Sequence, residues 1–281
     1  MKQFFKSILP VPVWKFLRYF LTLIGINHIS FETHVAEHCN LNCCGCDHFS
    51  PLADPEFVDI EEFRRDMERM GKLFSHKCGI IRLLGGEPLL NPEITTLMKI
   101  VRDNFTQGDI YIITNGALLA QQDKSFWTAC KDNNVQIKIS YYPISLDWEK
   151  IRAIANEFGV NCQYGTGSKA LFSKRPLDLS GNGDVHKNFV SCIRNGCTTL
   201  KHGKLYICSF IPHVDIFNRK FHQNIQVTED DYIDIYQKNI SAGKILWKLA
   251  HAAPACRYCD IASTRNDVSW HVSERKISEW V

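Results

Sequence analysis

Three cysteines in one short stretch have the type and spacing needed to hold part of an iron–sulfur cluster. Cys39, Cys43 and Cys46 follow the order C-x3-C-x2-C, and no fourth cysteine follows in register. A [4Fe–4S] cluster normally takes four cysteine thiolates. Three thiolates on one loop would hold three irons and leave one iron open to an exogenous ligand. Two other interpretations remain open, a zinc site and a chance grouping of buried thiols, although zinc favours paired C-x2-C units.

At these cysteines the chain resembles the radical S-adenosylmethionine (radical SAM) enzymes. The resemblance implies that Cys39, Cys43 and Cys46 hold a [4Fe–4S] cluster, and that S-adenosylmethionine chelates the open iron. In that family the reduced cluster cleaves the sulfonium, and the resulting 5′-deoxyadenosyl radical abstracts a hydrogen atom from the substrate. Cys44 lies outside the family's spacing and is interpreted as a non-ligand.

A second motif follows the second predicted strand. Gly85-Gly86-Glu87-Pro88 resembles the GGEP motif that holds the methionyl amino group in radical SAM proteins. Two glycines permit close backbone approach, and the Glu87 carboxylate can accept a hydrogen bond from an ammonium. Taken alone, the motif also fits an ordinary turn.

Two further positions resemble cofactor contacts of the same family. Asn115, in Thr114-Asn115-Gly116, corresponds to a position that often contacts the ribose or carboxylate of the cofactor, although TNG is also an ordinary turn. Ser140 resembles a ribose-contacting serine. The chain departs from the family at Gly45, where an aromatic residue usually precedes the last cysteine, and Phe49 is the expected replacement.

A second group of cysteines occupies the C-terminal part: Cys192, Cys197, Cys208, Cys256 and Cys259. The residues between the second and third predict a hairpin that turns at His202-Gly203. With its C-x2-C pair, the group resembles the start of the SPASM pattern, and more closely the shorter twitch domain with one auxiliary [4Fe–4S] cluster. The simplest ligand set is Cys192, Cys208, Cys256 and Cys259. Cys197 is then either an alternative ligand or a catalytic hydrogen donor beside the substrate, and zinc bound by four of the five remains the alternative.

The elements that must position these motifs alternate between strands and helices. Strands are predicted over residues 29–35, 80–84, 110–114, 135–140 and 160–164. Helices are predicted after the caps Asp59, Asn91 and Asp147 and around residues 126–130. This alternation predicts an α/β fold with parallel strands. The resemblance specifies a partial (β/α)6 TIM-type barrel with a small C-terminal cysteine-rich twitch domain. In such barrels ligands gather at the carboxyl ends of the strands, where the first three motifs occur.

The chain is expected to divide into three parts. Residues 1–27 form an apolar and basic helical segment, residues 28–185 the radical SAM barrel, and residues 186–281 the twitch-like domain. Residues 166–184 are expected to be a loop or linker. The unbroken apolar run of residues 1–27 is too short to span a bilayer. It is expected to pack across the bottom of the domain, with contact to a membrane interface as the alternative.

Composition limits the remaining classes. The net charge of +3 comes without a basic stripe, so nucleic acid is not indicated. Twelve cysteines without a signal peptide favour metal-bound thiols in the cytoplasm over disulfides. Cys78, Cys130 and Cys162 fall on apolar elements and are predicted to be core residues.

The resemblance therefore predicts a radical SAM oxidoreductase or epimerase with two [4Fe–4S] clusters and S-adenosylmethionine. Its expected partners are a small-molecule or glycan substrate and an electron donor such as flavodoxin or ferredoxin. A sugar, aminocyclitol or glycan is favoured as substrate, by analogy with short twitch enzymes and because no separate N-terminal domain is seen to grip a leader peptide. Two alternatives stay open: a maturase that modifies a ribosomally made peptide or protein, and a non-catalytic iron–sulfur or zinc scaffold.

Overall fold

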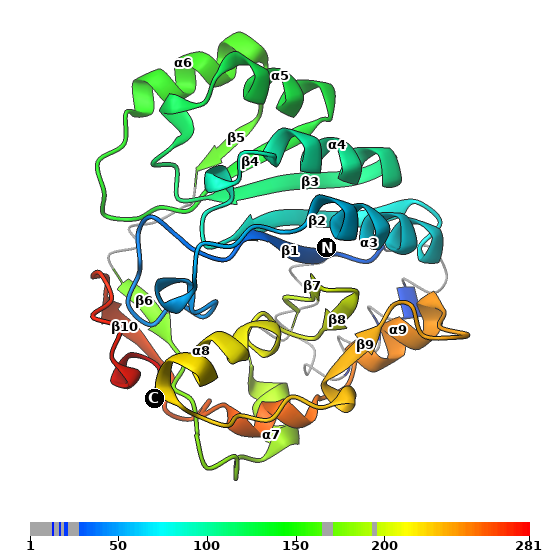
Figure 1. The fold of residues 1–281 in the computed structure, drawn as a ribbon, viewed down its shortest axis with the longest axis vertical. Helices are drawn as coiled ribbons and strands as arrows, with labels where there is room; N and C mark the ends of the chain where they lie inside the picture. Colours follow the sequence, from blue (N-terminus) through cyan, green and yellow to red (C-terminus); the bar gives the residue numbers. More distant parts are fainter. Residues whose placement is uncertain (1–12, 14–16, 18–19, 22–27, 165–170, 193–195) are drawn as a thin grey trace.

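The computed structural model describes residues 13, 17, 20–21, 28–164, 171–192 and 196–281 (Figure 1). The predicted N-terminal segment, residues 1–27, therefore lies almost entirely outside the described residues. In the part that is described, no helix has the length and apolar character needed to cross a bilayer.

An eight-stranded sheet, ordered β5-β4-β3-β2-β1-β7-β8-β9, is the centre of the molecule. Its first five strands in the chain are parallel: β1 (Phe31–Ala36), β2 (Lys77–Gly85), β3 (Gln107–Thr114), β4 (Val135–Ile139) and β5 (Cys162–Tyr164). A sixth parallel strand, β7 (Thr199–Lys201), lies on the other side of β1. The parallel α/β sheet is thus confirmed, but the sixth strand does not follow β5 as an uninterrupted six-unit barrel would require.

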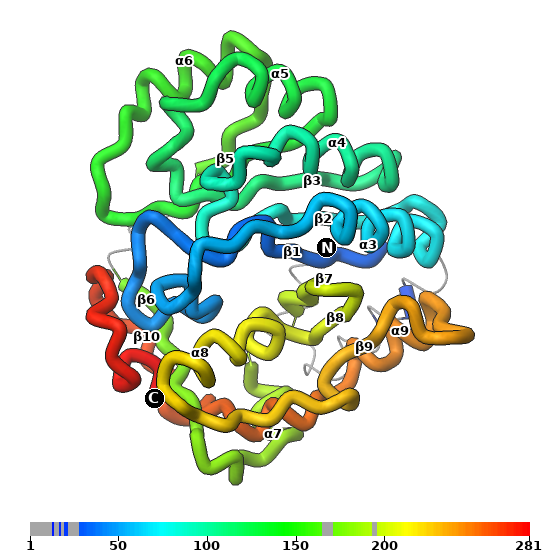
Figure 2. The backbone as a smooth tube through the Cα atoms, in the orientation of Figure 1, coloured from blue at the N-terminus to red at the C-terminus, as the bar shows by residue number. Residues whose placement is uncertain are grey.

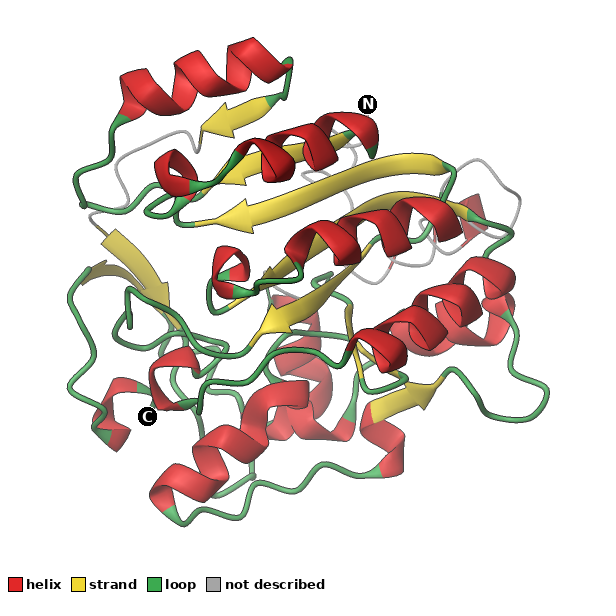
Figure 3. Cartoon of the chain, turned by 45° about the horizontal axis from the view of Figure 1, so that its top comes forward, coloured by secondary structure: helices red, strands yellow, loops and turns green. Residues whose placement is uncertain are grey.

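Four helices alternate with these strands and cover one face of the sheet (Figure 3): α3 (Ile60–Leu73), α4 (Ile94–Asn104), α5 (Lys124–Asp132) and α6 (Trp148–Phe158). Asp59 and Asp147 cap their helices as predicted, each accepting a backbone N–H three residues on. Alternate strand residues, such as Phe31 and Val35 of β1, join the helices in one large apolar core.

The predicted helix cap at Asn91 is wrong by two residues, because α4 begins at Ile94 and Glu93 stands at its cap. Asn91 stabilises the preceding turn instead, since its Oδ1 accepts from the backbone N–H of Glu93 at 2.8 Å. Its Nδ2 donates to the carbonyl of Val35 at 2.7 Å. The side chain therefore joins the start of the helix to β1.

The C-terminal part adds a hairpin to the edge of the main sheet. Strands β7 and β8 (Lys204–Tyr206) are antiparallel and turn at His202 and Gly203, which both have positive φ, as the predicted hairpin requires. Strand β9 (Tyr232–Asp234) pairs with β8. Three helices complete this part: α7 (Val185–Ser191), α8 (Val214–Phe221) and α9 (Ala242–Leu249).

Residues 166–184 are not simply a loop, because they contain strand β6 (Leu171–Lys174). This strand pairs antiparallel with β10 (Arg265–Ser269) in a separate two-stranded sheet. The backbone trace shows the C-terminal segment beside β6 (Figure 2). Because the partner strand lies about ninety residues away, local sequence carried no alternation strong enough to predict β6.

Candidate functional site

The predicted motifs meet in one pocket at the carboxyl end of the parallel strands. Its volume is about 240 Å³. Residues from the loop after β1 and from the ends of β2, β3 and β4 line it, and they include Cys39, Cys43, Cys46, Gly85, Gly86, Asn115 and Ser140. Segments that are far apart in the sequence therefore present the cysteines and the other motif residues to the same space.

The sulfurs of this pocket have N–H donors directed at them. The backbone N–H of Leu41 donates to Cys39 Sγ at 3.4 Å, and Trp270 Nε1 donates to Cys43 Sγ at 3.1 Å. Burial raises the pKa of Cys39 to about 11 and that of Cys43 to about 12. The thiols are therefore protonated at neutral pH unless a metal centre takes them as thiolates. Three thiols that line one pocket, two of them with N–H donors at sulfur, fit the thiolate-held cluster that the spacing predicts.

Cys44 faces a different partner from its three neighbours. Its thiol is hydrogen-bonded to the Glu279 carboxylate, and burial first, then this bond, raises its pKa to about 11. Its backbone N–H donates to the carbonyl of His271 at 2.9 Å. The contact stabilises a protonated thiol, which agrees with the expectation that Cys44 is not a ligand.

The two glycines of the GGEP motif are required by contact with the cysteine loop. A Cβ atom at Gly85 would lie 2.1 Å from the carbonyl oxygen of Ala36, and one at Gly86 would lie 2.0 Å from that of His38. The backbone N–H of Gly86 donates to the Ala36 carbonyl at 2.8 Å. The close approach predicted for these glycines is therefore made to the protein's own backbone, which leads directly into Cys39.

Glu87 lies beneath the pocket rather than in its wall. Its side chain is fully buried, and its carboxylate accepts hydrogen bonds from Thr114 Oγ1 at 2.6 Å, Asn115 N at 2.9 Å and Leu89 N at 3.1 Å. These bonds join the ends of β2 and β3. Oε1 accepts two of the three bonds and Oε2 only one, so Glu87 positions the neighbouring loop, and its contact with the cofactor ammonium stays a prediction.

Asn115 and Ser140 line the pocket and also fix its shape. Asn115 Nδ2 donates to Asn40 Oδ1 at 2.7 Å, which joins the loop after β3 to the cysteine loop. Asn115 Oδ1 accepts from the backbone N–H of Ala117 at 2.9 Å. The backbone N–H of Ser140 donates to the Thr114 carbonyl at 2.8 Å, which leaves the serine side chain to face the pocket.

The aromatic wall of the pocket was not predicted. Tyr142 and Phe172 line it, with ring centroids 5.8 Å apart and planes inclined by 26°. The expected replacement, Phe49, is instead buried in a second apolar core, where it contacts Phe217 and Trp280. Phe49 is wrong as the aromatic wall, because its side chain is buried in this second core and does not line the pocket that His48 and Ser50 on either side of it do line. Only the pairing of β6 with β10 brings Phe172 into place.

A second, smaller cavity collects the C-terminal cysteines predicted as the simplest ligand set: Cys192, Cys208, Cys256 and Cys259. Arg175 also lines it, and Nη1 donates to Cys192 Sγ at 3.3 Å. Asn188 Nδ2 donates to the carbonyls of Cys256 and Cys259, which fixes the backbone of the C-x2-C pair. Cys197 is not among the residues that line the cavity, and its role stays a prediction.

The sulfur separations bear on the choice of metal. Sulfurs that share a tetrahedral zinc ion lie roughly 3.8 Å apart, given Zn–S distances of about 2.3 Å. Among the described residues, no three cysteine sulfurs lie within 4.8 Å of one another. These sulfurs are therefore not gathered in threes around one tetrahedral point, and zinc bound by four of the cysteines stays the alternative at this cavity. The remaining cysteines match the prediction, since Cys78 and Cys130 are buried in the main apolar core and Cys162 packs against it.

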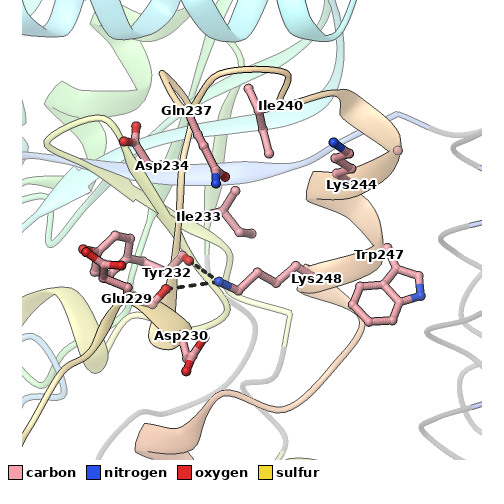
Figure 4. Close-up of a pocket in the computed structure, with 11 residues that line it drawn as sticks. Glu229, Asp230, Tyr232, Ile233, Asp234, Gln237, Ile240, Lys244, Trp247 and Lys248 are labelled. Atoms are coloured by element: carbon pink, nitrogen blue, oxygen red, sulfur yellow. Dashed lines mark hydrogen bonds between the residues drawn. The ribbon is translucent and has the colours of Figure 1, made fainter.

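A larger pocket of about 680 Å³ lies between β9 and α9 (Figure 4). Two residues of α9, Lys248 and Trp247, line it. Lys248 Nζ donates to the carbonyls of Glu229 and Tyr232. None of the residues predicted to take part in the chemistry lines this pocket. Size alone therefore does not mark the reactive centre.

Glu87 gives a prediction for the pH dependence of stability. Burial raises the pKa of its carboxyl from the ordinary value of 4.5 to about 7. Between these values the folded chain binds more protons than the unfolded chain, so the free energy of unfolding falls as pH rises. The shift corresponds to about 3 kcal/mol. In chemical denaturation of the cluster-free protein, the free energy of unfolding of Glu87→Gln should therefore lack the fall between pH 4.5 and 7 that Glu87 causes in the wild type.

The exposed Glu93→Gln serves as the control and should keep the wild-type pH dependence. If Glu87→Gln also followed the wild type between pH 4.5 and 7, the carboxyl would ionise as freely in the folded chain as in the unfolded one.

Comparison with known proteins finds a family model that matches part of the chain and solved structures of similar fold. Residues 33–157 match the model described as "Radical SAM superfamily". The crystal structure of BtrN in complex with AdoMet and 2-DOIA is similar over 83% of this chain and 93% of its own, with 14% identity and a TM-score of 0.51. That likeness supports the fold.

Two other solved structures match shorter parts of the chain. Native anSMEcpe with bound AdoMet and Cp18Cys peptide is 19% identical over 49% of this chain, with a TM-score of 0.39, and the match spans 42% of its length. Streptococcus suis SuiB bound to S-adenosylmethionine is 17% identical over 49% of this chain and 33% of its own, with a TM-score of 0.38. Cys39, Cys43 and Cys46 all lie inside the range that matches the radical SAM superfamily model, residues 33–157.

Proposed function

We propose that the protein is a radical SAM oxidoreductase that removes hydrogen from a small polar substrate, a sugar, an aminocyclitol or a glycan. The observation that carries the proposal is the single pocket shared by Cys39, Cys43, Cys46 and the ends of three neighbouring strands. A [4Fe–4S] cluster held there supplies reductive cleavage of S-adenosylmethionine, and with it a radical able to abstract a hydrogen atom.

The chain's own residues bind and orient the cofactor in this proposal. The backbone of Gly85 and Gly86 forms one wall, where side chains are excluded by the cysteine loop. Asn115 and Ser140 offer polar side chains to the ribose or carboxylate of the cofactor. Tyr142 and Phe172 form an apolar wall that limits the access of water to a reactive radical.

The likeness to BtrN, whose complex contains 2-DOIA, agrees with a small-molecule substrate without establishing one.

The second cavity is proposed to hold an auxiliary [4Fe–4S] cluster in a twitch-like domain. Its support is the convergence of four cysteines, Cys192, Cys208, Cys256 and Cys259, on one mainly apolar cavity. Such a cluster supplies acceptance of one electron, which suits dehydrogenation. Epimerisation, with Cys197 as the hydrogen donor, is the alternative outcome of the same first step.

Iron content tests the two proposed sites separately. The anaerobically reconstituted protein should hold about eight irons per chain, and about four after Cys39, Cys43 and Cys46 are all replaced by alanine. Replacing the four cysteines of the second cavity should remove the other half. Zinc in place of iron at the second cavity would contradict the auxiliary cluster and leave the first site standing.

Isotope transfer tests the substrate class. Carbon-deuterated inositols, aminocyclitols and hexoses would be supplied one at a time with S-adenosylmethionine and dithionite, and 5′-deoxyadenosine would be analysed by mass spectrometry. We expect deuterium in 5′-deoxyadenosine from at least one of them, together with a product that has lost that deuterium and one hydrogen. A product in which one hydrogen from solvent has replaced that deuterium would mean epimerisation. Transfer from a deuterated peptide alone would contradict the proposed substrate.

A further inference from the structure

We propose that Arg175 raises the reduction potential of the auxiliary cluster, so that this cluster is set to accept an electron rather than to donate one. The proposal rests on the auxiliary cluster proposed above. Arg175 directly follows β6 and is one of the residues that line the cavity of the four cysteines.

The guanidinium is held against sulfur rather than against a carboxylate. Its Nη1 donates to Cys192 Sγ at 3.3 Å, and no acidic side chain of the described residues forms an ion pair with it. Its Nε is buried without a hydrogen-bond partner in that same part of the chain.

A buried cation without an anionic partner is costly, and the cost falls if the cavity itself carries negative charge. A thiolate-held [4Fe–4S] cluster supplies that charge, whereas four protonated thiols do not. The rest of the lining is mainly apolar and does not screen the interaction: Phe189, Ile207, Phe210, Ile211, Ala255 and Ile261. Arg175 therefore matches a cluster in this cavity in both charge and hydrogen bonding.

The sign of the effect follows from electrostatics. Reduction makes the cluster one unit more negative, so a nearby fixed cation stabilises the reduced form more than the oxidised form. An N–H···S hydrogen bond acts in the same direction, and both are recognised determinants of cluster potential. Arg175 contributes both at once through Nη1.

A raised reduction potential of the auxiliary cluster favours dehydrogenation of the substrate over its epimerisation. Oxidation of an alcohol carbon to a carbonyl removes two hydrogens. One leaves as the abstracted hydrogen atom, and the other leaves as the hydroxyl proton, lost to solvent, and one electron, taken by the auxiliary cluster. The structure places the two sites on either side of one short segment, since Lys174 lines the first pocket and the adjacent Arg175 lines the second cavity. Epimerisation returns a hydrogen atom to the substrate and needs no such acceptor.

Redox titration of the auxiliary cluster tests the inference. The full chain with Cys39, Cys43 and Cys46 replaced by alanine isolates this cluster, and its reduced form would be counted by electron paramagnetic resonance. At a fixed potential, Arg175→Met should lower the ratio of reduced to oxidised cluster at least tenfold, which corresponds to 59 mV for a one-electron couple. Arg175→Lys, which keeps the charge, should shift the ratio less.

Arg257 provides the matched control. It lies between Cys256 and Cys259 in the sequence, but its guanidinium stacks over the ring of Tyr258 at 4.9 Å. Arg257→Met should therefore leave the ratio within about threefold of the parent, because its charge is partly exposed and screened by solvent.

The outcomes separate the inference from the function on which it rests. An unchanged ratio in Arg175→Met, with iron retained, would overturn the role of Arg175 and leave the cluster in place. Absence of iron from the parent at this site would overturn the auxiliary cluster itself. If Arg175→Met loses its iron, Arg175→Gln keeps a donor for Cys192 without the charge, and it must show the lowered ratio for the inference to stand.

Discussion

The backbone contact between the ends of β1 and β2 is the constraint on which the reactive centre depends. Gly86 N donates to the Ala36 carbonyl and Glu87 N donates to the His38 carbonyl, at 2.8 and 3.0 Å. At this separation a single Cβ atom at Gly86 would overlap the backbone of the other strand. The contact fixes where the chain leaves β1, and hence where the cysteine loop begins.

Other contacts extend this constraint around the pocket. The buried Glu87 carboxylate fixes the loop after β3, and Asn115 of that loop donates to Asn40 of the cysteine loop. From the opposite side, Trp270 donates to Cys43 Sγ and Trp280 Nε1 donates to the Cys46 carbonyl at 2.8 Å. The cysteine loop is thus held between the strand ends of the radical SAM domain and the C-terminal segment. A reactive centre needs such support, because its ligands must keep their positions while the chemistry proceeds.

The sequence predicted those features that depend on local pattern. Apolar alternation gave the parallel strands, and Asp59 and Asp147 marked helix starts, because capping depends on residues only three positions apart. The spacing of Cys39, Cys43 and Cys46 placed them in one pocket, which Cys44 also lines, and the simplest ligand set of the C-terminal resemblance lines the second cavity. The β7–β8 turn at His202-Gly203 was equally local.

Features made by distant segments could not be predicted in this way. Strand β6 exists because β10 pairs with it, and this pairing brings Phe172 to the pocket. Phe49 was misassigned because its place near the cysteines in sequence says nothing of the second apolar core that buries it. The burial of Glu87 could not be predicted from the local sequence either, since it depends on Thr114 at the end of another strand.

Formation of 5′-deoxyadenosine is the most direct measurement of the central claim. The anaerobically reconstituted protein, supplied with dithionite and S-adenosylmethionine, should produce it. Cys44→Ala should still produce it, because that thiol is hydrogen-bonded to Glu279 and is not expected to bind the cluster. A chain with Cys39, Cys43 and Cys46 replaced by alanine should produce none. Failure of the iron-loaded wild type to form 5′-deoxyadenosine, or equal formation by the triple variant, would contradict the assignment of this pocket as the radical-generating centre.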